Sequence, residues 1–123
     1  MTKVTVENII KRYPYVTDAI KRGLSRTSFY IGNRKFVIDI TEETKAVCEL
    51  VKIIVAVEKS SLIKQMINEI IAGQSDVFIM MDLPYSKNVY YDKKKAIIEK
   101  VYKCCISRGL VSFEEILNEE IAS

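Results

Sequence analysis

The spacing of apolar residues between positions 41 and 109 constrains this chain more than any other feature of its sequence. Leucine, isoleucine, valine and methionine recur there every three or four residues, as on the buried stripe of an amphipathic helix. The pattern stops at Gly73, Pro84 and Gly109, and glycine and proline are residues that end helices. We therefore expect several consecutive helices in this part of the chain.

Caps and apolar stripes predict three helices before Pro84. Thr41, which two glutamates follow, suits the N-terminus of the first helix, and Ser75 with Asp76 opens the third. The expected buried stripe of the first helix consists of Ala46, Leu50, Ile53, Ile54 and Val57. The stripe of the second consists of Leu62, Met66, Ile67, Ile70 and Ile71. The short third helix carries Val77, Phe78, Met80 and Met81.

A fourth helix is expected to begin at Ser86, to run to Arg108 and to stop at Gly109. After it, Ser112 and Glu115 fit the Ser-x-x-Glu capping box, in which two side chains satisfy free N–H groups at the start of a helix. This box predicts a last helix that ends near residue 122.

The N-terminal third of the chain has a different pattern. One helix is expected to begin after Thr5 and to be interrupted by Pro14, and a second is expected over residues 15–22. Two β-prone runs, 28–31 and 35–38, flank a two-residue Gly-Asn turn, which predicts a hairpin. The alternative is an ordered loop that aromatic side chains hold in place.

The expected fold class is therefore mainly α, with a small β-hairpin near residues 28–38. Residues 1–40 would hold the N-terminal helices and the hairpin. Residues 41–123 would form a helical domain with a helix-turn-helix toward its C-terminal end, and both parts would pack as one unit.

The charges of the chain are segregated along it, although the net charge is only +3. Residues 1–40 hold eight lysines and arginines against three acids, and residues 86–111 hold seven against two. The segments 41–85 and 112–123 are acidic. The two basic segments are candidate surfaces for a polyanion, and the two acidic segments would avoid one.

Residues 75–108 have the layout of a DNA-reading helix-turn-helix. Such a motif needs a short supporting helix, a tight turn and a second helix whose first residues reach base edges. Leu83, Pro84 and Tyr85 would form the turn, and Ser86 would cap the second helix. The free N–H groups behind that cap can also hold a DNA phosphate.

The residues behind Ser86 divide between two faces of the expected helix. Asparagine can bond adenine bidentately, and lysine can reach guanine or phosphate. The lysine run at positions 93–95 would mainly neutralise phosphates. The side expected to face the other helices contains Val89, Tyr90, Ala96, Ile97, Val101 and Cys104. The candidate DNA-binding residues are Ser86, Lys87, Asn88, Tyr91, Lys93, Lys94 and Lys95.

Flanking phosphate contacts are expected from Arg26, Arg34 and Lys35 in the N-terminal basic segment. The alternative is that these three residues form an ordinary exposed face.

The segment from Ser75 to Ala96 resembles the C-terminal part of the ArpU/RinA-type phage late-gene regulators, which are themselves similar to the −35-reading region of sigma factors. The matching residues are Leu83, Ser86, Tyr90, Tyr91, Lys94 and Ala96, and the aromatic residues around Pro14 are similar to the start of such proteins. The resemblance spans roughly residues 62–111. It implies binding to promoter DNA, contact with host RNA polymerase and activation of late operons in a phage or related mobile element.

Other classes of function find less support in the sequence. Catalysis is not expected, because the chain has no histidine, no Gly-rich phosphate loop and no nucleophile elbow. Neither a cofactor nor a zinc site is expected from three cysteines without a Cys-x-x-Cys pair. No signal peptide or membrane span is expected either, so we predict a cytoplasmic protein.

The alternative function is a helical protein-interaction module, either an adaptor to RNA polymerase or a small packaging protein. A homodimer is compatible with the acidic, amphipathic C-terminal segment, and the sequence does not decide it.

Overall fold

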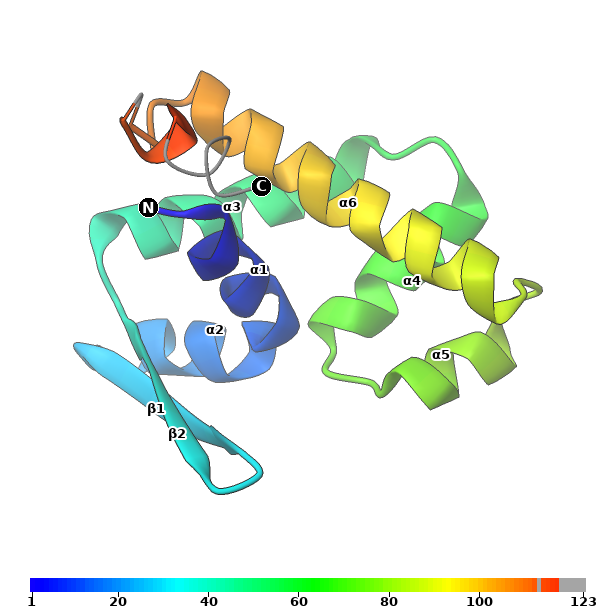
Figure 1. Ribbon diagram of the computed structural model, residues 1–123, viewed down its shortest axis with the longest axis horizontal. Helices are drawn as coiled ribbons and strands as arrows, with labels where there is room; N and C mark the ends of the chain where they lie inside the picture. Colours follow the sequence, from blue (N-terminus) through cyan, green and yellow to red (C-terminus); the bar gives the residue numbers. More distant parts are fainter. Residues whose placement is uncertain (113, 118–123) are drawn as a thin grey trace.

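The computed structural model describes residues 1–112 and 114–117 and is mainly helical with one antiparallel hairpin, as the sequence predicts. Figure 1 shows helices gathered around α1, with the hairpin extending to one side. The elements are α1 (Lys3–Lys11), α2 (Tyr13–Lys21), β1 (Arg26–Ile31), β2 (Arg34–Asp39), α3 (Glu42–Val57), α4 (Ser61–Ile71), α5 (Asp76–Asp82) and α6 (Lys87–Ser107). A helical turn follows at residues 114–117.

The two N-terminal helices differ from the prediction at their boundaries. α1 begins at Lys3 rather than after Thr5, because the Thr2 hydroxyl caps it by accepting a hydrogen bond of 3.2 Å from the Thr5 backbone N–H. Pro14 lies in the first turn of α2, where a missing N–H costs nothing, and Tyr13 is the first residue of that helix.

The predicted hairpin is present and pairs Phe29 with Phe36 across its two strands. Gly32 occupies the turn with a φ of +62°, a conformation that glycine adopts without strain. The two phenyl rings are stacked with centroids 5.7 Å apart, and the Arg12 guanidinium lies 4.6 Å from the Phe29 centroid. The Arg12 contact fastens the middle of the hairpin to the junction between α1 and α2.

The helix starts from residue 41 onward follow the predicted caps. The hydroxyls of Thr41, Ser75 and Ser86 each accept a hydrogen bond from the backbone N–H three residues later. The capping box also forms, since the Ser112 N–H donates to the Glu115 carboxylate and the Glu115 N–H donates to the Ser112 hydroxyl. The part of the expected last helix at residues 118–122 lies outside the described residues.

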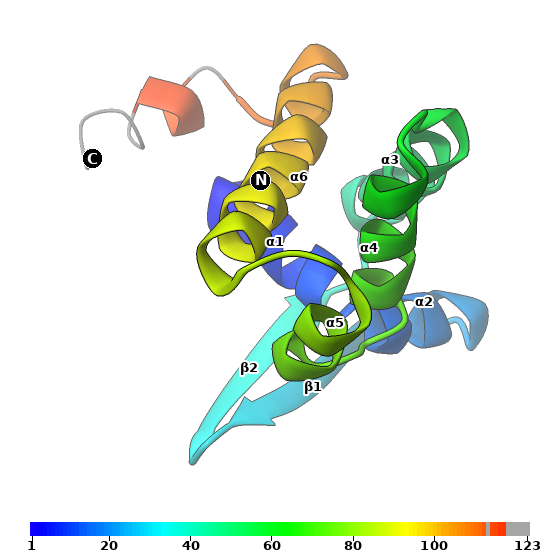
Figure 2. The ribbon, with the colours of Figure 1, turned by 90° about the vertical axis from the view of Figure 1, so that its right-hand side faces the viewer.

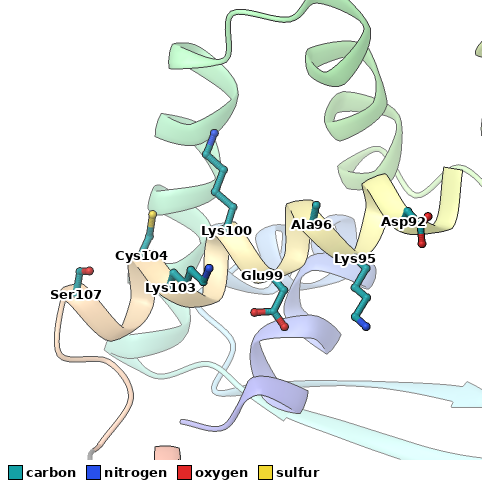
Figure 3. Close-up of a pocket in the computed structure, with 8 residues that line it drawn as sticks. All are labelled: Asp92, Lys95, Ala96, Glu99, Lys100, Lys103, Cys104 and Ser107. Atoms are coloured by element: carbon teal, nitrogen blue, oxygen red, sulfur yellow. The ribbon is translucent and has the colours of Figure 1, made fainter. Parts of the chain in front are cut away.

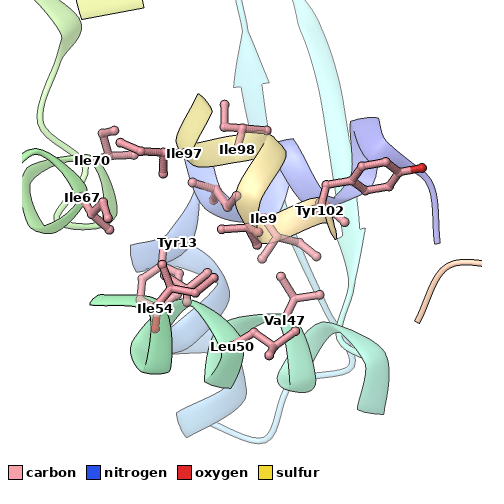
Figure 4. Packing of buried hydrophobic residues seen from close by; sticks show 14 of the residues in the cluster. Ile9, Tyr13, Val47, Leu50, Ile54, Ile67, Ile70, Ile97, Ile98 and Tyr102 are labelled. Carbon is pink, nitrogen blue, oxygen red and sulfur yellow. The ribbon is translucent and has the colours of Figure 1, made fainter. Parts of the chain in front are cut away.

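A single hydrophobic cluster contains side chains from both the N-terminal segment and the later helices. α1 contacts α3, α4 and α6, and Ile9 lies fully buried among them. Figure 4 shows this region, where Val47 and Leu50 of α3 approach Ile9 and the side chains of α6.

The predicted stripe of α3 is partly wrong. Ile53 and Val57 are exposed, and the buried face is formed by Thr44, Val47, Cys48, Leu50, Val51 and Ile54. Because α3 is apolar on several sides, spacing alone fits more than one stripe, and the contacts with α1 and α6 select the one that is buried. Leu62 of α4 is likewise exposed.

Figure 2 shows α5 lying across the end of α4 and close to the N-terminal end of α6. The Gln65 amide of α4 donates a hydrogen bond of 2.9 Å to the Asp82 carboxylate of α5. Within the described residues, no helix combines the length and apolar character that crossing a membrane requires.

Candidate nucleic-acid interface

The region from α5 to α6 has the three parts of a helix-turn-helix. α5 has seven residues, residues 83–86 connect it to α6, and α6 extends over 21 residues. Leu83 is buried and anchors the turn in the core. The Ser86 hydroxyl accepts from the Val89 N–H at 3.4 Å, so the cap starts α6 directly after the turn. The N-terminal end of α6 is thereby held in a defined position.

Asp76, in the first turn of α5, fastens this short helix to α6. Its Oδ1 atom accepts a hydrogen bond of 2.5 Å from the Tyr90 hydroxyl and one of 2.6 Å from the Lys94 ammonium. Tyr90 itself is fully buried. A buried tyrosine ring with a satisfied hydroxyl fixes both packing and orientation, so it sets the angle between the two helices.

The titration of these groups reflects the same contacts. Burial acts to raise the pKa of Asp76, but hydrogen bonds from Lys94 and Tyr90 and the charges of Lys94 and Lys11 outweigh it and hold that pKa below its usual value. Burial and the bond to Asp76 together raise the pKa of Tyr90. At neutral pH the carboxylate is therefore ionised and the phenol is neutral.

Most of the predicted DNA-binding residues lie on one accessible arc of α6. Ser86, Lys87, Asn88, Tyr91 and Lys95 are exposed, and Tyr91 retains 42% of its accessible surface. None of the ion pairs among the described residues involves Lys87 or Lys95. The structure therefore brings together, at the start of the helix, an amide, a phenol and two cations that form no ion pair with any described residue.

Two of the predicted residues are engaged within the protein. The Lys94 side chain is only 15% exposed and is paired with Asp76, so its expected position on the open arc was wrong. The Lys93 ammonium lies 5.2 Å from the centroid of the Tyr85 ring and is half-buried. Adjacent lysines on a helix point in different directions, and only Lys95 of the run is fully on the exposed side.

The opposite side of α6 also differs in part from the prediction. Tyr90, Ile97 and Val101 are buried as expected, whereas Val89 and Ala96 are exposed. The remaining buried positions are Ile98, Tyr102 and Cys105. α6 contacts α1 as well as α3. Its buried face is therefore wider than contact with α3, α4 and α5 alone would require, and it is rotated around the helix axis.

The C-terminal half of α6 carries further exposed lysines, Lys100 and Lys103, that the predicted site does not include. An open hollow of about 600 Å³ follows this side of the helix, and Figure 3 shows Lys95, Lys100 and Lys103 around it together with Asp92 and Glu99. Lys100 is paired with Glu58 at 3.4 Å. Lys100 and Lys103 stand three residues apart, a spacing that places them near one another on a helix surface, and this spacing was the available signal in the sequence.

The hairpin presents the second group of predicted phosphate contacts. Arg26, Arg34 and Lys35 are all exposed. The Arg34 guanidinium lies 5.8 Å from the Phe36 centroid, near the turn. In Figure 1 the tip of the hairpin and α5 both lie at the lower side of the molecule, and α6 has its N-terminal end toward that side.

A smaller groove of about 370 Å³ separates α1 from the N-terminal half of α6. Its lining mixes both signs of charge and consists of Lys3, Glu7, Lys11, Asp76, Tyr91, Lys94, Lys95, Ile98 and Glu99. Lys11 is paired with Glu7 at 2.7 Å, and Lys3 is paired with Glu99. Asp76 and Lys94 thus lie at the wall of a solvent-accessible groove next to the exposed arc.

No family model, no curated protein and no solved structure matches this chain. Among the described residues, no group of three or more cysteine, aspartate or glutamate side chains is arranged to hold a metal ion.

Proposed function

We propose that this protein binds double-stranded DNA and inserts the N-terminal half of α6 into the major groove. The observation that carries the proposal is the exposed arc of Lys87, Asn88, Tyr91 and Lys95 at the start of a helix that follows a tight, anchored turn. An α-helix fits the major groove, and the residues of its first turns are those that reach base edges.

Each residue of the arc has a distinct role in this proposal. Asn88 bonds an adenine edge, and Lys87 bonds a guanine or a phosphate. The Tyr91 hydroxyl contacts the phosphate backbone of the DNA. Lys95 neutralises a phosphate further along the groove, and the exposed Lys103 adds positive charge toward the C-terminal end of the helix. The backbone N–H groups behind Ser86 receive another phosphate.

The hairpin supplies flanking contacts in the same proposal. Arg26, Arg34 and Lys35 are exposed on a two-stranded element that extends away from the helices. Such an element reaches the DNA phosphate backbone beside the groove that α6 occupies. Its contacts add affinity but do not discriminate between DNA sequences.

Together with the resemblance of residues 75–96 to late-gene regulators, these features favour a non-enzymatic transcription regulator of a phage or mobile element that activates late operons.

A second candidate function rests on α5. The side chains of Val77, Phe78 and Met81 are 64%, 47% and 83% exposed, which is unusual for three apolar residues on one short helix. They favour a protein-interaction module, with RNA polymerase as the expected partner class. The two functions differ in their response to salt, because phosphate contacts weaken steeply as salt rises and apolar contacts do not.

Fluorescence anisotropy with duplex fragments from the protein's own locus tests DNA binding. We expect one fragment to bind preferentially, with an affinity that falls as salt rises. The variant that combines Lys87→Ala, Asn88→Ala and Tyr91→Ala should lose this preference. The matched control combines Lys59→Ala, Asn68→Ala and Tyr15→Ala, which removes the same exposed side-chain types elsewhere. Equal binding by the two variants would contradict the proposal.

A further inference from the structure

Lys94 differs from the other lysines of α6 in what surrounds its ammonium group. It lies 2.6 Å from Oδ1 of Asp76, and its side chain is only 15% exposed. The same oxygen atom accepts the Tyr90 hydroxyl at 2.5 Å. Asp76 is therefore held in place by a fully buried neighbour, and the carboxylate cannot move away from Lys94 without breaking the bond to Tyr90.

The surroundings of Asp76 resemble those of a bound phosphate. The carboxylate lines the groove between α1 and α6 together with Lys11, Lys94 and Lys95, and two glutamates of the same lining pair with Lys11 and with Lys3. The charges of Lys94 and Lys11 both act on it. The Asp76 carboxylate is in contact with the Lys94 ammonium beside the exposed start of α6, so it occupies the position in which a DNA phosphate would otherwise pair with that lysine.

We infer that Asp76 is an intramolecular competitor of DNA phosphate, which withholds Lys94 from the backbone and so limits the affinity of α6 for DNA. This inference rests on the proposed function. The three lysines of the run then have different partners. Lys95 contacts DNA, Lys93 packs on the Tyr85 ring, and Lys94 forms an ion pair with Asp76 in place of a phosphate.

The substitution Asp76→Asn tests the inference. Asparagine keeps an acceptor for the Tyr90 hydroxyl and has nearly the same shape, but it carries no charge to hold Lys94. We expect Asp76→Asn to bind a random-sequence DNA duplex about three- to tenfold more tightly than wild type at low salt. The slope of log affinity against log salt should become steeper by about one, as one further lysine meets a phosphate.

Two controls separate this effect from a general change in charge. Asp18→Asn removes the same charge from an exposed site on α2 and should leave the slope unchanged. Lys94→Met should lower the affinity of the wild type only slightly, because Lys94 is already withheld and only the unpaired charge of Asp76 is added, but it should abolish the gain in the Asp76→Asn background. If Asp76→Asn does not fold, the comparison of Lys94→Met with wild type still tests the inference.

The outcomes distinguish this inference from the proposed function. If wild type binds no duplex even at low salt, both are overturned. If wild type binds DNA with a salt-dependent affinity but Asp76→Asn leaves affinity and slope unchanged, the proposed function stands and the inference is wrong. A large loss of wild-type affinity in Lys94→Met, with folding intact, also contradicts it.

Discussion

The Tyr90 hydroxyl lies 2.5 Å from Oδ1 of Asp76, and this hydrogen bond joins the first turn of α5 to the buried side of α6. The tyrosine is fully buried, whereas the carboxylate reaches the groove beside α1. One contact therefore connects the core of the helix-turn-helix to its accessible surface. The angle at which α6 presents its exposed arc depends on this contact.

Removing the hydroxyl with Tyr90→Phe should lower the free energy of unfolding by about 1.5–2 kcal/mol, the typical worth of a hydrogen bond to a charged group. The ring stays in the core, so the loss reflects the missing bond. Urea unfolding followed by circular dichroism measures it. Tyr91→Phe is the matched control on the exposed side and should change the stability by less than about 0.5 kcal/mol. Equal losses in both variants would mean that the Asp76 contact contributes nothing specific.

The contacts of Asp76 also predict how stability changes in acid. The pKa of this carboxyl is lowered in the folded protein, so its contribution is present above the unfolded pKa and is lost as pH falls through the folded pKa. We expect wild type to be more stable than Asp76→Asn at pH 7. The difference in unfolding free energy should shrink below about pH 4, near the ordinary pKa of aspartate. A difference that does not change with pH would show that charge plays no part.

The three cysteines should react with a thiol reagent at different rates. Burial is the main cause that raises the pKa of Cys48 to about 11, and burial likewise raises the pKa of Cys105 to about 11. Both thiols stay protonated and shielded at pH 8, whereas Cys104 is half-buried. One thiol per chain should therefore react quickly with Ellman's reagent in the native protein, and Cys104→Ser should remove that fast phase. Rapid reaction of all three would contradict the packing of α3 and α6.

Two helix-ending glycines provide a matched pair that tests the contact between Pro14 of α2 and Gly73, which follows α4. Gly73 and Gly109 have φ values of +82° and +73°, so alanine is strained at both. A Cβ at Gly73 would also lie 3.2 Å from Cγ of Pro14, whereas one at Gly109 meets nothing within 4 Å. We expect Gly109→Ala to cost about 1 kcal/mol of unfolding free energy and Gly73→Ala about 2 kcal/mol. Thermal and urea unfolding of both variants check the order, and the reverse order would contradict the Pro14 contact.

Local signals made the elements of this fold predictable. Thr41, Ser75 and Ser86 each have a hydroxyl that can bond an N–H three residues later, and such a cap depends only on nearby sequence. The hairpin was predictable because the Gly-Asn turn between two β-prone runs is also a local signal. The start of α1 was missed because the cap at Thr2 lies so close to the chain terminus.

The partners of individual side chains were not predictable in the same way. Lys94 has the sequence context of a solvent-facing lysine, yet Asp76 lies 18 residues away and binds it across the turn. Ile53 and Val57 fit an apolar stripe as well as Val47 and Val51 do, and only the positions of α1 and α6 decide between them. Both outcomes depend on tertiary contacts that spacing along one helix does not contain.

In the proposed complex, DNA meets the first half of α6 and the hairpin. The most direct test is an NMR titration of ¹⁵N-labelled protein with the preferred duplex at low salt. We predict that the largest amide shifts occur at residues 86–95, with a second group at residues 31–35, and that both disappear as salt rises. Shifts confined to α5 around Phe78, or none at all, would contradict DNA binding through α6 and the hairpin.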